Sequence, residues 1–280
     1  MTGIVLLTGG TGFVGRQVLA QLLAQSIPVR VITRSKTKYL MSLDDQLESI
    51  ILTEDLFAEN QTWWEKTCRG IDTIIHVAWY AEPGKYLNSV KNLDCMIGTL
   101  VLARACASVG VRRFVGVGTC FEYDLAEGRL SVDTPLKPTT PYAAAKASVF
   151  SSLSEYFSTV GIEFVWCRLF YLYGEGEDSR RLVPYLRSKL EKGEPAELTS
   201  GNQIRDFIDV TEAGALIVKV ALGSYIGAVN VCSGVGITVK ELAESIADEY
   251  GRRDLLRFGA RPDNLIDPPC VVGIIEKSVM

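Results

Sequence analysis

Three side chains in the middle of the sequence have the types and spacing needed to move a proton to or from a substrate oxygen. Tyr142 and Lys146 stand four residues apart in a segment that opens with Thr140 and Pro141, a pattern typical of a helix start, so both lie on one helical face. A phenol has a pKa of ~10, and a neighbouring ammonium lowers it. Thr119 ends an apolar run that predicts a strand. We therefore predict a catalytic set of Thr119, Tyr142 and Lys146; the simpler alternative is a helix-start tyrosine beside a solvated lysine.

A glycine-rich turn near the N-terminus is predicted to hold a cofactor. The segment 9–15 (GGTGFVG) lies between the apolar run 4–7, which predicts a buried strand, and residues 18–23, whose spacing predicts a helix. Glycine allows a tight bend and a close ligand, and the N–H groups that open the helix suit a pyrophosphate. Against the alternative of a ligand-free turn, we predict dinucleotide binding by Gly9, Thr11, Gly12, Phe13, Val14 and Gly15.

Arg34 indicates which dinucleotide is bound. It follows the predicted strand 29–33, at the position where an acid binds the free ribose hydroxyl of NAD and an arginine accommodates the 2′-phosphate of NADP. No acid stands at this strand end. The sequence therefore favours NADP(H), with NAD(H) and a merely solvated basic loop as the alternatives.

Further cofactor contacts are expected where later strands end. Asp55 and Leu56 follow the third predicted strand and are candidates to border the adenine, although a simple loop aspartate fits almost as well. Ala78 closes the fourth strand beside the cofactor, whereas His76, inside that apolar strand, is expected to be a packed structural residue. Strands alternate with helices through this region, which predicts an α/β fold of the Rossmann type with a doubly wound parallel sheet.

Composition excludes several classes of function. The 280 residues carry a net charge of −4, which gives no attraction to nucleic acid or to an anionic membrane surface, and we expect no stretch of membrane-spanning length. The apolar N-terminal run lacks a basic leader, so we interpret it as a strand and not as a signal peptide. Seven cysteines without paired spacing predict neither a metal site nor disulfides, and fit a reduced cytoplasm.

These motifs together resemble the extended short-chain dehydrogenase/reductase family, in particular its nucleotide-sugar epimerases, dehydratases and reductases. The resemblance runs from Thr8 to about Gly259, and its carriers are the glycine turn, Thr119 four residues before Tyr123, Tyr142 with Lys146, Arg168-Leu169 leading to Tyr173-Gly174, the segment 205–208 and the segment 230–234. It implies that Thr119 binds the reacting sugar oxygen, that Tyr142 is the acid or base, and that Lys146 binds the nicotinamide ribose and tunes Tyr142. It also implies a Rossmann domain of residues 1–168 with 203–231, and a smaller substrate-binding lobe of residues 169–202 and 232–280.

The resemblance also suggests residues that contact the substrate. Arg205 would meet a phosphate of the nucleotide diphosphate, with an ion pair to Asp206 or Asp209 as the alternative, and Arg261 is a weaker candidate for the same role. Trp79 and Tyr171 stand where many relatives have alanine and asparagine, so the sugar pocket is expected to differ in shape. Family dehydratases carry an Asp-Glu pair after the catalytic threonine, whereas this chain has Cys120 and Phe121, which argues against dehydration.

The function predicted from the sequence is NADPH-dependent reduction of the 4-keto group of a nucleotide-diphosphate-linked 4-keto-6-deoxyhexose. A looser resemblance of the segments 201–208 and 257–260 to the abequose synthase group supports this interpretation. One alternative is a nucleotide-sugar 4-epimerase, and another is a non-catalytic dinucleotide-binding sensor or scaffold. By analogy with the family we expect a homodimer formed through the helices that contain Leu100 and Phe150, and a substrate lobe that the short tail 277–280 leaves trimmed or completed by another subunit.

Overall fold

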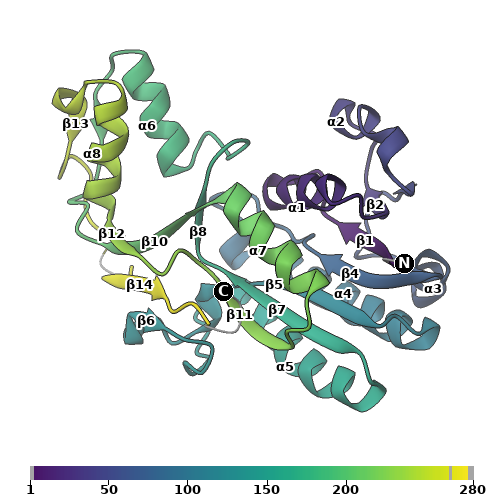
Figure 1. The fold of residues 1–280 in the computed structure, drawn as a ribbon. Coiled ribbons are helices and arrows are strands. Elements are labelled where there is room, and N and C mark those ends of the chain that lie inside the picture. The colour runs from purple at the N-terminus through teal and green to yellow at the C-terminus, as the bar shows by residue number, and fades with distance from the viewer. Residues whose placement is uncertain (1–2, 265–266, 277–280) are drawn as a thin grey trace.

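The computed structural model describes residues 3–264 and 267–276, and a parallel sheet of seven strands forms its larger part (Figure 1). The tail residues 277–280, on which the expectation of a trimmed lobe rests, lie outside the described residues. The spatial order of the strands is β11-β7-β5-β4-β1-β2-β3, and every neighbouring pair is parallel. The strands are β1 (Ile4–Thr8), β2 (Val29–Thr33), β3 (Ser49–Leu52), β4 (Ile71–His76), β5 (Arg113–Thr119), β7 (Glu163–Leu169) and β11 (Gly227–Val231). The strand order reverses between β1 and β4, so the carboxyl ends of these two strands border the crevice in which such sheets bind ligands.

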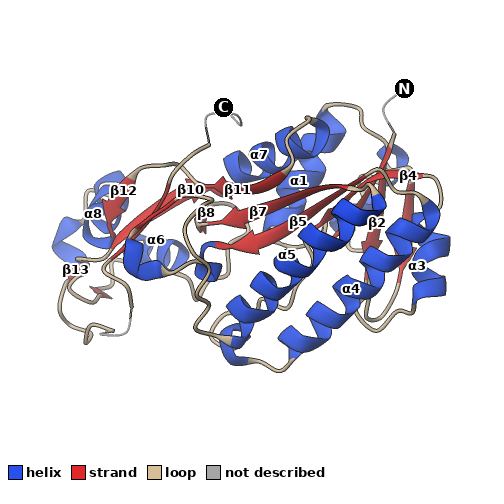
Figure 2. Cartoon of the chain, turned by 90° about the horizontal axis from the view of Figure 1, so that it is seen from below, coloured by secondary structure: helices blue, strands red, loops and turns tan. Residues whose placement is uncertain are grey.

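Helices cover both faces of this sheet, as the doubly wound prediction requires (Figure 2). One apolar cluster joins the sheet to α1 (Phe13–Ala24) and α7 (Val210–Leu222), with the short α2 (Lys38–Met41) at its edge. The other cluster joins the opposite face to α3 (Gln61–Cys68), α4 (Lys91–Val109) and α5 (Pro141–Val160). The predicted start of α5 is confirmed, because Pro141 is its first residue and the Thr140 hydroxyl accepts a hydrogen bond from the Ala143 N–H at 3.2 Å.

A second, smaller sheet carries the remaining helices. Its order is β12-β10-β14-β6, with β8 also paired to β10. The strands are β6 (Arg129–Leu130), β8 (Tyr171–Tyr173), β10 (Ile204–Asp209), β12 (Gly236–Thr238) and β14 (Cys270–Gly273). A separate apolar cluster joins α6 (Leu182–Glu191) and α8 (Val239–Glu249) to the short pair β9 (Ala196–Glu197) and β13 (Leu256–Arg257). This lobe lies beyond the carboxyl ends of β5 and β7, since only Phe170 separates β7 from β8 (Figure 1).

The chain crosses between the two parts more than once. It leaves the large sheet after β7, returns through α7 and β11, and leaves again for β12 and α8. The predicted boundaries, 1–168 with 203–231 against 169–202 with 232–280, stay a prediction, and β10, which lies within 203–231, hydrogen-bonds in the smaller sheet.

One expectation about hydropathy was wrong. Among the described residues, α4 is long and apolar enough to cross a membrane by length and composition. It packs against α3 and α5, and the side chains of Leu102, Ala103 and Cys106 are buried in the second apolar cluster. A buried core helix and a membrane span meet the same criteria of length and composition. The sequence pattern alone therefore does not distinguish the two.

Candidate active site

The glycine turn has the shape of a dinucleotide cradle. Gly9 has a φ of +73°, which favours glycine, and a Cβ at Gly9 would lie 2.7 Å from the Ala78 nitrogen. A Cβ at Gly15 would lie 2.0 Å from the Gly9 carbonyl oxygen, so α1 can start so close to β1 only with glycine there. Gly12 is the N-cap of α1 and no side chain caps this end, which leaves the first N–H groups of the helix for an anion. These features fit a pyrophosphate.

The other predicted cofactor residues lie at the carboxyl ends of neighbouring strands. Arg34 follows β2 and is exposed, with Lys36 and Lys38 nearby in sequence. Asp55 is exposed beyond β3, where its carboxylate accepts the Phe57 N–H at 3.0 Å, and Leu56 packs against the second apolar cluster. Ala78 follows β4 and donates its N–H to the Thr8 hydroxyl at 3.2 Å, which joins the ends of β1 and β4.

His76 is structural, as its place in an apolar strand predicts. Its ring lies between the hydroxyls of Thr8 and Thr99, at 2.9 Å and 3.0 Å, and only 2% of the residue is exposed. Burial, together with the nearby charge of Lys146, lowers the pKa of His76 to about 3. It is therefore a neutral imidazole that ties β1, β4 and α4 together.

Thr119 and Tyr142 meet where β5 ends and α5 begins. Thr119 is the last residue of β5 and Tyr142 the second residue of α5, and the Thr119 hydroxyl lies near enough to the Tyr142 phenol to lower its pKa. The Tyr142 ring packs edge-to-face against the ring of Tyr86, with centroids 4.8 Å apart. The two predicted proton-handling side chains are thus neighbours at this strand end.

The predicted lowering of the Tyr142 pKa by Lys146 stays a prediction, and burial acts against it. Burial raises the pKa of Tyr142 well above its usual value, Tyr86, Glu122 and Cys120 raise it further, and the nearby Thr119 hydroxyl lowers it. Burial also lowers the pKa of Lys146 to about 7, which weakens the ammonium that was expected to act on the phenol. Tyr142 is therefore a protonated phenol, ready to donate.

Lys146, four residues after Tyr142 on α5, is buried against aromatic rings. It is 2% exposed, and its Nζ donates to the Val117 carbonyl at 2.5 Å. The Nζ lies 3.8 Å from the centre of the Trp79 ring and 5.7 Å from that of Trp166. The Trp79 indole is itself held in place, because its Nε1 donates to the Asn92 carbonyl oxygen at 2.9 Å.

Some of the predicted substrate residues lie close to one another after Thr119. Cys120 is buried directly after it, and Phe121 packs edge-to-face on Tyr171 with centroids 6.1 Å apart. The guanidinium carbon of Arg205 lies 5.3 Å from the centre of the Tyr171 ring. Neither Cys120 nor Phe121 brings a carboxylate to this place.

The two arginines predicted to meet a phosphate differ in position. Arg205 is 3% exposed and pairs with Asp267 at 2.6 Å. The alternative to phosphate binding was an ion pair with Asp206 or Asp209, and the carboxylate that Arg205 contacts is a different one. Asp206 instead accepts backbone N–H groups of Ser233, Gly234 and Gly273. The side chain of Arg261 contacts Tyr185 and Glu197 on the outer part of the smaller lobe.

Sequence reasoning missed Glu122, which is wholly buried three residues after Thr119. Its carboxylate accepts the Thr119 N–H at 2.8 Å, and the Thr119 hydroxyl accepts the Phe121 N–H in the same short turn. The two hydrogen bonds together form a capping box. A threonine followed three residues later by a glutamate is the sequence signature of that motif and could have indicated it. Among the described residues no cluster of histidine, cysteine and carboxylate side chains could hold a metal ion.

Comparisons with known proteins agree on one family. The profile of the NAD dependent epimerase/dehydratase family matches residues 5–231. The chain is 23% identical to dTDP-6-deoxy-L-talose 4-dehydrogenase (NAD(+)) of Aggregatibacter actinomycetemcomitans, covering 96% of this chain and 98% of that protein. It is 26% identical to dTDP-glucose 4,6-dehydratase of Streptomyces niveus, covering 88% and 77%. The structure of the UDP-glucose 4-epimerase of Thermus thermophilus in complex with NAD superposes with a TM-score of 0.82 at 26% identity, covering 97% and 90%, and confirms the predicted fold.

Proposed function

The chain belongs to the NAD dependent epimerase/dehydratase family, and from that premise we propose that it reduces the 4-keto group of a nucleotide-diphosphate-linked 4-keto-6-deoxyhexose. The family establishes an NAD-dependent enzyme that acts on nucleotide sugars. The three relatives named above are a 4-dehydrogenase, a dehydratase and an epimerase, so the choice among reactions rests on the residues of this chain.

The proximity of Thr119 and Tyr142 carries the proposal. Reduction of a ketone needs a proton donor at the oxygen on which negative charge develops. The raised pKa of Tyr142 keeps its phenol protonated, and the neighbouring Thr119 hydroxyl can hold the same substrate oxygen. When bound, NADPH supplies the hydride. Lys146, one turn further along α5, binds the nicotinamide ribose in this proposal.

Dehydration is the least supported of the three reactions. Elimination of water from a sugar needs an acid and a base beside the catalytic threonine, and the chain offers there a thiol and a phenyl ring. Burial raises the pKa of the Cys120 thiol far above its usual value, so it is a poor proton shuttle. The epimerase is the closer rival, because it would use Thr119, Tyr142 and Lys146 in the same places.

NADP(H) is the proposed cofactor, although relatives are named with NAD. Arg34 is exposed directly after the end of β2. The guanidinium carbon of Arg16, on α1, lies 5.1 Å from the centre of the Tyr39 ring, on α2. A guanidinium suits a 2′-phosphate. Arg34→Ala should weaken NADPH binding by about tenfold or more while NADH binding changes little, since a lost phosphate contact costs ~1.5–3 kcal/mol.

Oxidation of NADPH, followed by absorbance, tests the reaction directly. The substrates are a panel of 4-keto-6-deoxy sugar nucleotides with different bases, with NADH as the parallel cofactor. Consumption with one member, lost in Tyr142→Phe, is the expected result. Silence across the panel with both cofactors, combined with 4-epimerisation of an unmodified nucleotide sugar, would favour the epimerase. Binding without any turnover would favour the sensor.

We also propose a homodimer in the cytoplasm. The outer faces of α4 and α5 carry exposed apolar side chains, with Leu93 48%, Ile97 56% and Val160 43% exposed, which suits burial against a second copy. All seven cysteines are free thiols, as a reducing compartment allows. Sedimentation equilibrium of the wild type and of Ile97→Glu tests the dimer, which the substitution should split.

A further inference from the structure

Glu122 is a wholly buried carboxylate at the centre of the candidate site. Its Oε1 accepts the Thr119 N–H at 2.8 Å, its Oε2 pairs with the Arg168 Nε at 2.7 Å, and the Trp166 Nε1 lies 3.0 Å from both oxygens. Arg168 is equally buried, at 1% exposed. Three donors from β5 and β7 thus fix this one carboxylate.

The strand beside Glu122 leaves room for this arrangement. A Cβ at Gly118 would lie 2.4 Å from the Glu122 Oε1 and 2.2 Å from the Trp166 Nε1. A Cβ at Gly116 would lie 2.3 Å from the Trp166 ring. Only glycine fits at both positions. Because Gly116 and Gly118 have no side chains, the Glu122 carboxylate and the Trp166 indole can lie close to β5.

We propose that Glu122 is a positioning residue of the active site, whose carboxylate fixes the backbone of Thr119 and supplies the buried negative charge that balances the Lys146 ammonium. The proposal rests on the proposed function only in that Thr119 and Lys146 take part in the reaction. Glu122 does not touch the substrate oxygen in this scheme. Glu122 acts through Thr119, which binds the substrate oxygen in the proposed reaction, and through Lys146, which binds the cofactor ribose.

The Trp166 indole links Glu122 to Lys146: its Nε1 lies 3.0 Å from both Glu122 oxygens, and its ring centre lies 5.7 Å from the Lys146 Nζ. Burial lowers the pKa of Lys146 to about 7, and the groups that oppose this are the Glu122 carboxylate first and the Cys95 thiol on α4 second. His76 on β4 faces it as a neutral ring, and the remaining neighbours are the faces of Trp79 and Trp166. Burial raises the pKa of Cys95 to about 11, so Cys95 carries no charge at neutral pH. Arg168 pairs with Glu122 at 2.7 Å, so the negative charge that acts on Lys146 is weaker than that of a lone carboxylate.

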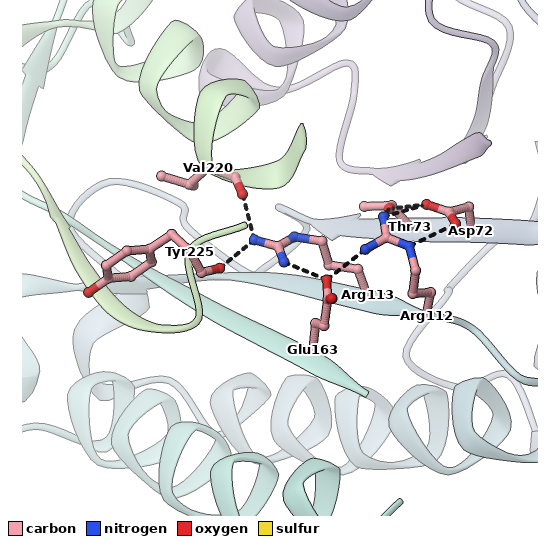
Figure 3. Close-up of polar contacts among 7 residues, drawn as sticks. All are labelled: Asp72, Thr73, Arg112, Arg113, Glu163, Val220 and Tyr225. Carbon is pink, nitrogen blue, oxygen red and sulfur yellow. Dashed lines mark hydrogen bonds and ion pairs between the residues drawn. The ribbon is translucent and has the colours of Figure 1, made fainter. Parts of the chain in front are cut away.

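Two substitutions separate the two roles. Glu122→Gln keeps an acceptor for the Thr119 N–H but removes the charge, whereas Glu122→Asp keeps the charge but draws the carboxylate away from Thr119. Glu163→Gln is the matched control, because Glu163 pairs with the buried Arg113 at 2.7 Å at the opposite end of the same two strands (Figure 3). It disturbs a comparable pair far from Thr119.

The first measurement is the titration of Lys146 in protein labelled with ¹³C at lysine Cε, assigned with Lys146→Met. Glu122→Gln should lower the midpoint by roughly one pH unit or more, while Glu122→Asp and Glu163→Gln leave it near the wild-type value. An unchanged midpoint in a folded Glu122→Gln protein would overturn the electrostatic role. This arm needs no substrate, so it stands even if the proposed reaction is wrong.

The second measurement is steady-state turnover on the substrate that the panel identifies. Glu122→Asp should lower kcat by about tenfold or more and leave KM within about twofold of the wild-type value. The reason is that a shifted Thr119 hydroxyl no longer contacts the substrate oxygen in the transition state. Glu163→Gln should keep the wild-type kcat. A wild-type kcat in Glu122→Asp would overturn the positioning role, and this variant also carries the test if Glu122→Gln does not fold. Silence of the wild type across the panel would count against the reaction and leave the titration to decide on Glu122.

Discussion

The ammonium nitrogen of Lys146 lies 3.8 Å from the centre of the Trp79 ring, so an indole covers the lysine predicted to hold the cofactor ribose. The ring attracts the cation but also keeps water from it. Burial is the larger effect, because the pKa of Lys146 falls to about 7. Trp79 therefore influences how much of Lys146 is charged at neutral pH.

Replacing Trp79 should restore the ammonium. In Trp79→Ala water reaches Lys146, and its pKa should rise toward the usual value of ~10.4, whereas Trp79→Phe keeps a ring in place and should change it little. The lysine titration described above measures both. A lower midpoint in Trp79→Ala would mean that the attraction of the ring outweighs its exclusion of water.

His76 should make stability depend on acid pH. Its pKa is about 3 in the folded protein and 6.5 when unperturbed, so between these values the unfolded chain binds one more proton than the folded chain. The contribution of His76 to stability is thus fully present above pH 6.5 and is lost as the pH falls, at up to ~1.4 kcal/mol per unit. Urea denaturation between pH 7 and pH 5 measures the loss.

The control for this prediction is His76→Gln, which cannot titrate. Carboxylates contribute to the same pH range, and the difference between the two proteins isolates the imidazole. The chain has a single histidine, so its ring resonance can be followed without assignment. Equal losses of stability in both proteins, or a ring that titrates near 6.5, would contradict the prediction.

The large sheet could be predicted from the sequence because its signals are local. Each strand is a short apolar run followed by a turn and an amphipathic helix, and the glycine turn fixes which strand comes first. The smaller sheet could not be predicted in the same way. The strands β6 and β14 have two and four residues and pair across much of the chain, and such short segments carry no period of their own.

The candidate site shows the same division. Thr119, Tyr142 and Lys146 were predictable, since helix spacing and a strand end place them. The Trp79 ring over Lys146 and the pairing of Arg205 with Asp267 depend on contacts between distant segments, for which no local pattern exists. The burial that raises the pKa of Tyr142 likewise comes from the packed fold and not from spacing.

Gly15→Ala should abolish dinucleotide binding. The added methyl carbon would lie 2.0 Å from the Gly9 carbonyl oxygen, so either the turn or the start of α1 must move. Gly12→Ala is a graded control, because its Cβ would lie 3.3 Å from the same oxygen. Fluorescence of bound NADPH should disappear in Gly15→Ala and be weakened only partly in Gly12→Ala. Full binding by a folded Gly15→Ala protein would show that the cofactor does not need this turn.

The pair of Glu163 and Arg113 should support the fold without touching the reaction. Arg113 is fully buried, and besides Glu163 it donates to the carbonyls of Val220 and Tyr225, which ties β5 to the end of α7 (Figure 3). Breaking a fully buried ion pair costs ~3–5 kcal/mol, but the Glu163 side chain is 37% exposed and solvent screens it. We expect Glu163→Gln to lower the free energy of unfolding by about 1–3 kcal/mol in urea denaturation.

Asp72→Asn supplies the comparison for that value. Asp72 pairs with Arg112 at 2.9 Å, and both side chains reach solvent, 33% and 51% exposed. An exposed pair of this kind contributes less than ~1 kcal/mol. Both substitutions remove a partner of Arg112, which contacts Glu163 at 2.6 Å as well as Asp72, and only Glu163→Gln also breaks the pair with Arg113. The difference between them therefore measures chiefly what the pair with the buried Arg113 adds. Equal destabilisation would show that Arg113 does not depend on Glu163 and is held by the two carbonyls alone.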